Sequence, residues 1–181
     1  MTSSTINTPR LFIEHVVEPD VNDFLRDPAD LRNAFHACIS LLSLRDWVVA
    51  QHQGKSWSYE QIPMGQIPRE GHLLQSILAE RSKLFDYIAD IGNAAKHMIR
   101  RKATSSGVSL IESATVSRGV TYRGGALLGS MSMGQAMFNQ IPKPKEFDCA
   151  VVEIDGRERF VHELVKNARV IWRRLFDENT W

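Results

Sequence analysis

The sequence predicts an α+β fold that is mainly a helical bundle, with two long helices, a C-terminal helix and a small antiparallel β-meander inserted before the last helix. Apolar residues recur at helical spacing over two long stretches in the first half of the chain and over one at its end. Two short apolar runs flank Asp155 and Gly156, and this is the strongest short-range signal for a β-hairpin. The length of 181 residues suits a single domain covering residues 1–181.

Composition excludes several classes of protein. With 43% hydrophobic residues, 24% charged residues and a net charge of +1, the chain is neither largely disordered nor a globally basic nucleic-acid binder. Two cysteines are too few for a disulfide framework or a structural zinc site. No secretory signal is visible, and no stretch approaches the ~18 apolar residues of a membrane span. We therefore expect a cytoplasmic protein with no membrane partner.

The N-terminal third is expected to be irregular at first and then helical. Residues 1–18 are predicted to form a tail, with a short strand at 11–13, and a brief helix follows over 21–26. A long helix is predicted over 28–52, because Pro28 suits a first helical turn and apolar residues follow at helical spacing.

A loop over 54–69 and a second long helix over 70–101 come next. Gly92 lies inside this second helix and costs about 1 kcal/mol relative to alanine there. A close packing contact or a kink is therefore expected at Gly92.

The second half of the chain is predicted to carry the meander. A strand is expected over 108–116, and strands over 147–154 and 157–161 form the hairpin. Residues 118–140 are rich in glycine and methionine and are expected to be a flexible insert. An amphipathic helix over 162–177 ends the fold.

Each long helix carries a stripe of polar residues on one face. On the first helix the stripe comprises Asn33, His36, Ser40 and Ser43, and on the second it comprises Asp86, Asp90, Asn93 and His97. If the stripes face each other, His97 or His36 can transfer protons while Asp90 and Asn93 orient them. The alternative interpretations are a hydrogen-bond network between the helices and a solvated face. The sequence leaves the direction of both stripes open.

Three cations near the end of the second helix, Lys96, Arg100 and Arg101, are candidate ligands for a nucleic-acid phosphate. The alternative is an ordinary charged surface, balanced by the 21 acidic residues of the chain. The sequence has no zinc-helix, P-loop or dinucleotide motif, so no metal or other cofactor is expected.

Two segments, 33–48 and 88–97, resemble a widespread group of uncharacterised bacterial proteins, in which a Gly-rich stretch, a hairpin and an amphipathic C-terminal helix also follow. The resemblance covers most of residues 30–176. More loosely, the helical part is similar to HEPN-type bundles, which occur in toxins and phage-defence ribonucleases.

The HEPN motif is an arginine, usually followed by a polar residue, and a histidine that is separated from the arginine by four to six intervening residues. In those enzymes the pair cuts RNA without a metal: the histidine assists attack by the 2′-OH and the arginine steadies the phosphate charge. Arg45, Asp46 and His52 fit this spacing. The resemblance thus implies a second, competing site at Arg45 and His52, and it also implies a homodimer.

The first functional hypothesis is accordingly a HEPN-like, metal-independent ribonuclease from a toxin or phage-defence context, with RNA as its partner. The alternative is a non-catalytic binding or assembly subunit whose 118–140 segment docks a protein partner, since flexible methionines such as Met131 and Met133 suit such an interface. A third hypothesis is a small-molecule sensor with a pocket between the helices and the meander.

Overall fold

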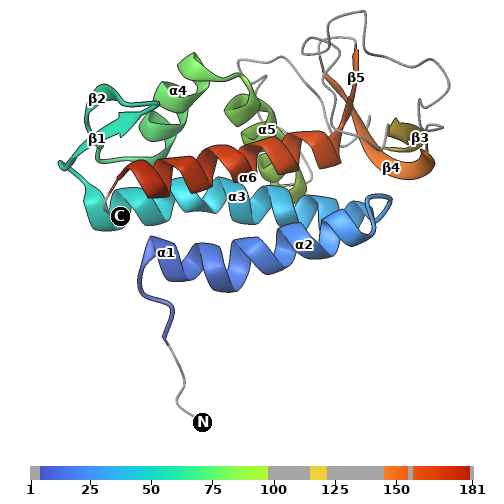
Figure 1. Cartoon of the computed structure of the whole chain (residues 1–181), viewed down its shortest axis with the longest axis horizontal. Coiled ribbons are helices and arrows are strands. Elements are labelled where there is room, and N and C mark those ends of the chain that lie inside the picture. Colours follow the sequence, from blue (N-terminus) through green and yellow to red (C-terminus); the bar gives the residue numbers. More distant parts are fainter. Residues whose placement is uncertain (1–4, 98–114, 122–144, 155–156, 180–181) are drawn as a thin grey trace, which may run out of the picture.

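The computed structural model describes residues 5–97, 115–121, 145–154 and 157–179. The predicted class is confirmed: the protein has an α+β fold that is mainly helical (Figure 1). The helices are α1 (Pro9–Phe12), α2 (Glu18–Arg26), α3 (Leu31–His52), α4 (Gly71–Arg81), α5 (Leu84–His97) and α6 (Val161–Glu178), with a π turn η1 (Ile13–Val17) between α1 and α2. The strands are β1 (Ser56–Tyr59), β2 (Ile62–Gln66), β3 (Thr115–Thr121), β4 (Lys145–Ile154) and β5 (Arg157–Phe160).

Residues Pro9–Arg26 form one continuous helical segment, called here the N-terminal arm. The side chain of Thr8 caps it by accepting a hydrogen bond from the backbone N–H of Leu11 at 3.1 Å. The predictions of a tail over residues 1–18 and of a strand at 11–13 are therefore wrong from Pro9 onward. Pro19 cannot donate a backbone hydrogen bond, and the π turn just before it accommodates the missing donor without breaking the helix.

The predicted helix over 70–101 is in fact two helices. The backbone N–H of Ser82 makes the last hydrogen bond of α4, to Leu78, and the carbonyl of Ser82 then accepts from Phe85 at the start of α5. No glycine or proline marks this break, which is why periodicity alone joined the two helices. The part of the prediction beyond His97 lies outside the described residues.

The predicted loop over 54–69 contains an antiparallel hairpin of β1 and β2. Its turn is made by Glu60 and Gln61, which have φ values of +52° and +62°. Such a turn usually contains asparagine or glycine, so the sequence has no hairpin signal here. Trp57 and Tyr59 of β1 are buried in the core and anchor the hairpin to the helices.

The tip of this hairpin is tied to the end of α6. Arg174 bonds to the Glu60 carboxylate at 2.6 Å, and the carboxylate of Glu178 accepts from the Gln61 backbone N–H at 3.2 Å. Asn179 pairs with Ser58 through two hydrogen bonds of 2.9 Å, one to its N–H and one to its carbonyl. The side-chain amide of Asn179 thus makes the two hydrogen bonds to Ser58 that the backbone of a third strand would otherwise make.

The second sheet is antiparallel, with strand order β3-β4-β5. The predicted pairing of 147–154 with 157–161 is confirmed, with Val151 opposite Phe160. β3 begins at Thr115 and extends to Thr121, so residues 118–121, the first part of the predicted insert, belong to a strand. Residues 108–114 and 122–140 lie outside the part of the chain that is described.

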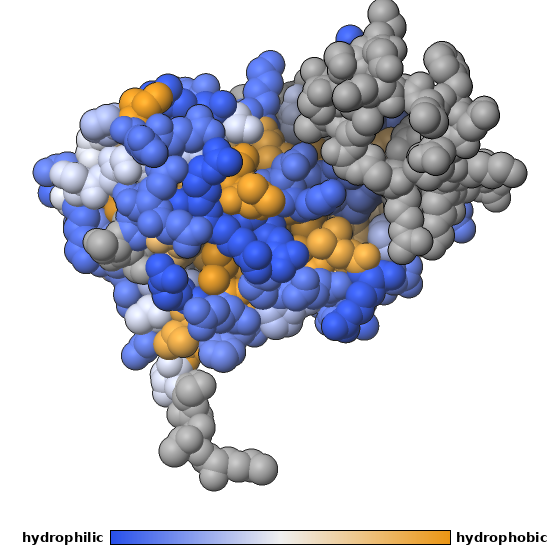
Figure 2. Space-filling model, viewed as in Figure 1, coloured by the Kyte–Doolittle hydropathy of each residue, from blue (hydrophilic) through white to orange (hydrophobic). Residues whose placement is uncertain are grey.

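The core lies between α6 and the helices that it contacts, α2, α3 and α5. Trp172 of α6 is buried and meets the Phe85 ring edge-on, with ring centroids 5.8 Å apart. The arm is joined to α3 by a stacked pair, Phe12 on Trp47, at 4.9 Å. Hydrophobic residues also reach the surface, where Figure 2 shows them as patches beside hydrophilic ones. Among the described helices, none combines the length and apolar character needed to cross a membrane.

Candidate functional site

The polar stripe of α3 points away from α5. A Cβ on Gly92 of α5 would lie 3.2 Å from the carbonyl oxygen of Cys38 and 3.0 Å from Cδ2 of Leu42, so these two residues mark the side of α3 that faces α5. At about 100° per residue, His36 and Ser40 lie roughly on the opposite side. His36 is exposed. The two stripes therefore do not face each other, and His36 is separated from Asp90 and Asn93.

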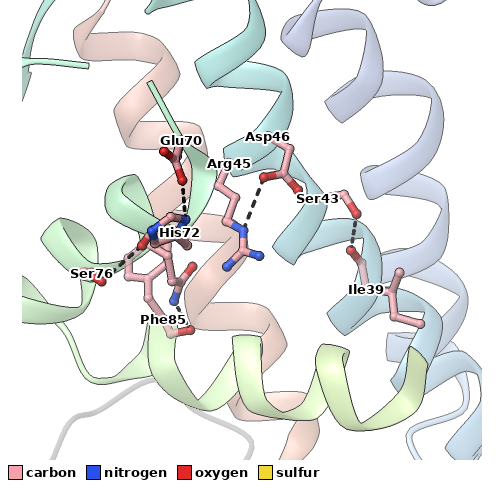
Figure 3. A network of polar contacts seen from close by, with 9 residues as sticks. Ile39, Ser43, Arg45, Asp46, Glu70, His72, Ser76 and Phe85 are labelled. Carbon is pink, nitrogen blue, oxygen red and sulfur yellow. Dashed lines mark hydrogen bonds and ion pairs between the residues drawn. The ribbon is translucent and has the colours of Figure 1, made fainter. Parts of the chain in front are cut away.

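The serines of the α3 stripe bond within their own helix. Ser40 donates to the carbonyl of Ala37 at 3.1 Å, and Ser43 donates to that of Ile39 at 2.8 Å (Figure 3). Side-chain hydroxyls inside helices commonly bond in this way. This face of α3 therefore fits the structural alternative better than a proton-transfer site.

On α5 the stripe is partly buried. Asp90 is 3% exposed and Asn93 is partly exposed. The side chains of Lys96 and His97, together with Arg100 and Arg101, lie outside the described residues, so their roles stay predictions.

His52 is buried at the end of α3, with its Nδ1 3.1 Å from Nζ of Lys55. Burial lowers the pKa of His52, and the positive charge of Lys55 lowers it further. Arg45 lies seven residues earlier on the same face, about 10 Å along the helix axis. Both influences on the pKa of His52 favour its neutral form, and its imidazole is set apart from the Arg45 guanidinium.

Arg45 lies where α3 meets the start of α4. A Cβ on Gly71, the first residue of α4, would lie 3.3 Å from Cγ of Arg45 and 1.9 Å from Oδ1 of Asp46, so a side chain there would displace the Asp46 carboxylate from its present position. The Arg45 side chain is 17% exposed, and its Nε is buried without a hydrogen bond to any described residue. Its ion-pair partner is the exposed carboxylate of Asp46, at 3.5 Å.

His72, in the first turn of α4, directly follows Gly71. Its Nδ1 lies 3.2 Å from Oε2 of Glu70, and its side chain is 65% exposed. Figure 3 shows Arg45 extending from α3 on the side away from Ser43, and His72 in the first turn of α4; Gly71, the residue before His72, is the one that packs against Arg45. We call Arg45, Asp46, Glu70, Gly71 and His72 together the Arg45–His72 site.

Sequence reasoning identified Arg45 but missed His72. Twenty-six residues and a hairpin separate the two along the chain, and no spacing rule links them. Their proximity depends on how α4 packs against α3. The only local signal is the acidic residue two positions before His72, and such a pair is common by chance.

Two groups of this site have chemistry that bears on a phosphate ester. A guanidinium binds phosphate oxygens through paired N–H groups, and an imidazole held by a carboxylate can accept or donate a proton. Among the described residues, no group of three or more histidine, cysteine or acidic side chains is placed to hold a metal ion.

No family model, curated protein or solved structure matches this chain.

Proposed function

We propose that this protein is a HEPN-like ribonuclease that cleaves cytoplasmic RNA without a metal ion, as a toxin or phage-defence component. One observation carries the proposal: the largely buried Arg45, whose Nε is paired only with the exposed carboxylate of Asp46 at 3.5 Å among the described residues, packs against Gly71, and the next residue is an exposed histidine paired with a carboxylate. Arginine of this kind serves phosphate recognition, because its fork of N–H groups matches phosphate oxygens.

In the proposed reaction the imidazole of His72 accepts the proton of a ribose 2′-OH. The 2′-oxygen then bonds to the adjacent phosphorus as the bond from phosphorus to the 5′-oxygen breaks, and the 5′-oxygen takes up a proton from water or from the imidazolium. Arg45 offsets the negative charge that builds on the phosphate oxygens. Glu70, with Oε2 3.2 Å from Nδ1 of His72, orients the imidazole. The products are a 2′,3′-cyclic phosphate and a 5′-hydroxyl.

This assignment changes the roles expected from the sequence. Arg45 keeps its expected role as the phosphate ligand. His72 replaces His52, because His52 is buried beside Lys55 whereas His72 is accessible. His36 takes no part, since it lies on the other side of α3. The homodimer implied by the resemblance stays a prediction.

The test is cleavage of a single-stranded RNA in the presence of EDTA, read out as newly formed cyclic-phosphate ends. We expect Arg45→Gln and His72→Gln each to reduce cleavage at least 100-fold, since positioned acid–base groups contribute about 10²–10⁴-fold. His36→Gln is the matched control, an exposed histidine on the far side of α3, and it should cleave like the parent. Circular dichroism checks that all variants are folded.

Two outcomes would overturn the assignment. Full activity in His72→Gln with loss in His52→Gln or His97→Ala would move the acid–base role to those histidines. Absence of cleavage by the parent protein on every RNA tested would favour the alternative function, an assembly subunit that docks through 118–140. In that case deletion of residues 122–140 should abolish capture of a protein partner.

A further inference from the structure

A cavity of about 340 Å³ lies between the N-terminal arm and the C-terminal part of α6. The arm and α6 run in opposite directions past each other (Figure 1). We call this cavity the arm pocket, and its lining residues are Arg10, Ile13, Glu14, Glu18, Arg173, Phe176 and Asp177. None of them belongs to the Arg45–His72 site.

One wall of the arm pocket carries an excess positive charge. The carboxylate of Glu18 accepts hydrogen bonds from the guanidinium groups of both Arg169 and Arg173, with Nε of Arg173 at 2.9 Å. Two guanidinium groups thus share one carboxylate, and one positive charge is left over. Glu18 is 15% exposed and Arg173 is 54% exposed, so the remaining charge is presented by Arg173.

The rim of the arm pocket carries negative charge. Glu14 on η1 and Asp177 on α6 are both exposed, and neither forms an ion pair with any described residue. Each of these carboxylates can accept charge-assisted hydrogen bonds from an ammonium group.

The floor of the arm pocket is apolar. Ile13 and Phe176 are 9% and 4% exposed, and the guanidinium of Arg10 lies 6.0 Å from the centroid of the Phe176 ring. Arg10 is also held in place by a hydrogen bond of 3.2 Å to the carbonyl of Phe176. The π turn contributes both Ile13 and Glu14, and π turns frequently occur at functional sites.

We propose that the arm pocket binds a small zwitterion, a free α-amino acid with an apolar side chain. Its carboxylate pairs with Arg173, its ammonium group lies between Glu14 and Asp177, and its side chain packs on Ile13 and Phe176. A volume of about 340 Å³ is near the lower end of ligand cavities and suits a ligand of this size. This binding is independent of the proposed RNA cleavage.

The test is isothermal titration calorimetry of the full chain with L-leucine and L-phenylalanine. N-acetyl-L-leucine lacks the ammonium charge and L-leucinamide lacks the carboxylate, so each should bind at least about tenfold more weakly than L-leucine. Glu14→Gln and Arg173→Gln should each weaken binding of L-leucine by a similar factor. In Arg173→Gln the Glu18 carboxylate keeps its bonds to Arg169, so the fold is retained.

Arg174→Gln is the matched control. Arg174 adjoins Arg173 in sequence and is similarly exposed, but it pairs with Glu60 and does not line the arm pocket. Its loss should leave binding unchanged. The proposal is overturned if neither amino acid binds at millimolar concentration, if the acetyl and amide derivatives bind as well as L-leucine, or if Glu14→Gln and Arg173→Gln bind like the parent.

Discussion

Gly92 of α5 lies directly against the backbone carbonyl of Cys38 in α3, where a Cβ atom would be only 3.2 Å from the oxygen. The side chain of Leu42 closes the other side of the same contact, at 3.0 Å. Of the two expectations at Gly92, a packing contact or a kink, the structure shows the packing contact. This contact also fixes which side of α3 faces α5, and therefore where the polar residues of α3 point.

Gly92→Val should destabilise the protein by about 1–3 kcal/mol, because the backbone at Cys38 cannot move aside as a flexible side chain would. Valine is a better helix former than glycine, but that gain is smaller than the cost of the clash. Denaturation by urea measures the difference. Ala50→Val, at an exposed position of α3, is the control and should change stability by less than about 1 kcal/mol. Equal stability of the two variants would contradict the close contact.

Glu18 should make the stability of the protein depend on pH in the acid range. Burial by itself raises the pKa of Glu18, but the hydrogen bonds and charges of Arg169 and Arg173 outweigh burial and hold the pKa below its ordinary value of 4.5. The unfolded chain therefore takes up a proton first as the pH falls. The stabilisation is fully present above about pH 4.5 and is lost as the pH falls through the lower pKa of the folded state.

Glu18→Gln tests this relationship. The variant should lose about 1.5–3 kcal/mol at pH 7, because two guanidinium groups lose a charged hydrogen-bond partner. Its free energy of unfolding should also fall less steeply than that of the parent below pH 4.5. Parallel pH profiles for parent and variant, measured by thermal unfolding, would show that Glu18 is not the responsible group.

Gln61→Gly should stabilise the protein by up to about 1 kcal/mol. Gln61 has a φ of +62°, a conformation that costs a residue with a side chain about 1–2 kcal/mol. Glycine avoids this cost, but it also loses more backbone entropy on folding, which offsets part of the gain. The backbone N–H that bonds to Glu178 is retained in the variant. Gln66→Gly, an exposed position of β2 with ordinary φ, should instead destabilise. A lower melting temperature for Gln61→Gly than for the parent would contradict the strain.

Gly71→Ala should reduce RNA cleavage while leaving the fold largely intact. The added methyl group would lie where the Asp46 carboxylate now is, so Asp46 and the neighbouring Arg45 must shift. A shift of about 1 Å in a positioning group can cost a factor of 10² in rate. Cleavage rate and melting temperature are measured together. The double variant Gly71→Ala with Asp46→Ala removes the closest clash and should recover much of the activity; no recovery in the double variant would contradict this interpretation.

The thiol of Cys38 should be unreactive in the folded protein. Cys38 is buried among apolar residues, and burial raises the pKa of its thiol well above the ordinary value of 9.0. In a Cys149→Ser background, a thiol reagent should label Cys38 only after unfolding by guanidinium. An additional Ala50→Cys substitution, which places a thiol on the exposed side of α3, provides the positive control. Rapid labelling of Cys38 in the native state would mean that α3 and α5 separate readily.

The elements that could be predicted are those with strong periodicity or a clear turn signal. Helices α3 and α6 have long apolar stripes, and the hairpin of β4 and β5 has Asp155 and Gly156 between its strands. The β1–β2 hairpin could not be predicted, because Glu60 and Gln61 adopt positive φ without the usual residue types. The arm was missed because Pro19 interrupts the helical pattern, and the π turn that absorbs it has no sequence signature.

The candidate site was predictable only in part, for a geometric reason. Periodicity places His36 and Ser40 on one face of α3, but it does not say which neighbour that face meets. The answer depends on Gly92, a residue without a side chain. Its contact with Cys38 and Leu42 shows that α5 packs against the face of α3 opposite to His36 and Ser40. Only the packing of α4 against α3 brings Gly71, the residue before His72, against Arg45.

The π turn also sets the rotational phase of the arm. A π turn acts as a one-residue insertion in an α-helix, so everything before Ile13 is rotated by about 100° from where an uninterrupted helix would place it. In the unrotated arm, Phe12 would leave Trp47 and Arg10 would leave the last turn of α6. Deleting a single residue from the π turn would therefore act like a twist of the arm about its own axis, disengaging its N-terminal end from the bundle while the pairing of Glu18 with α6 persists.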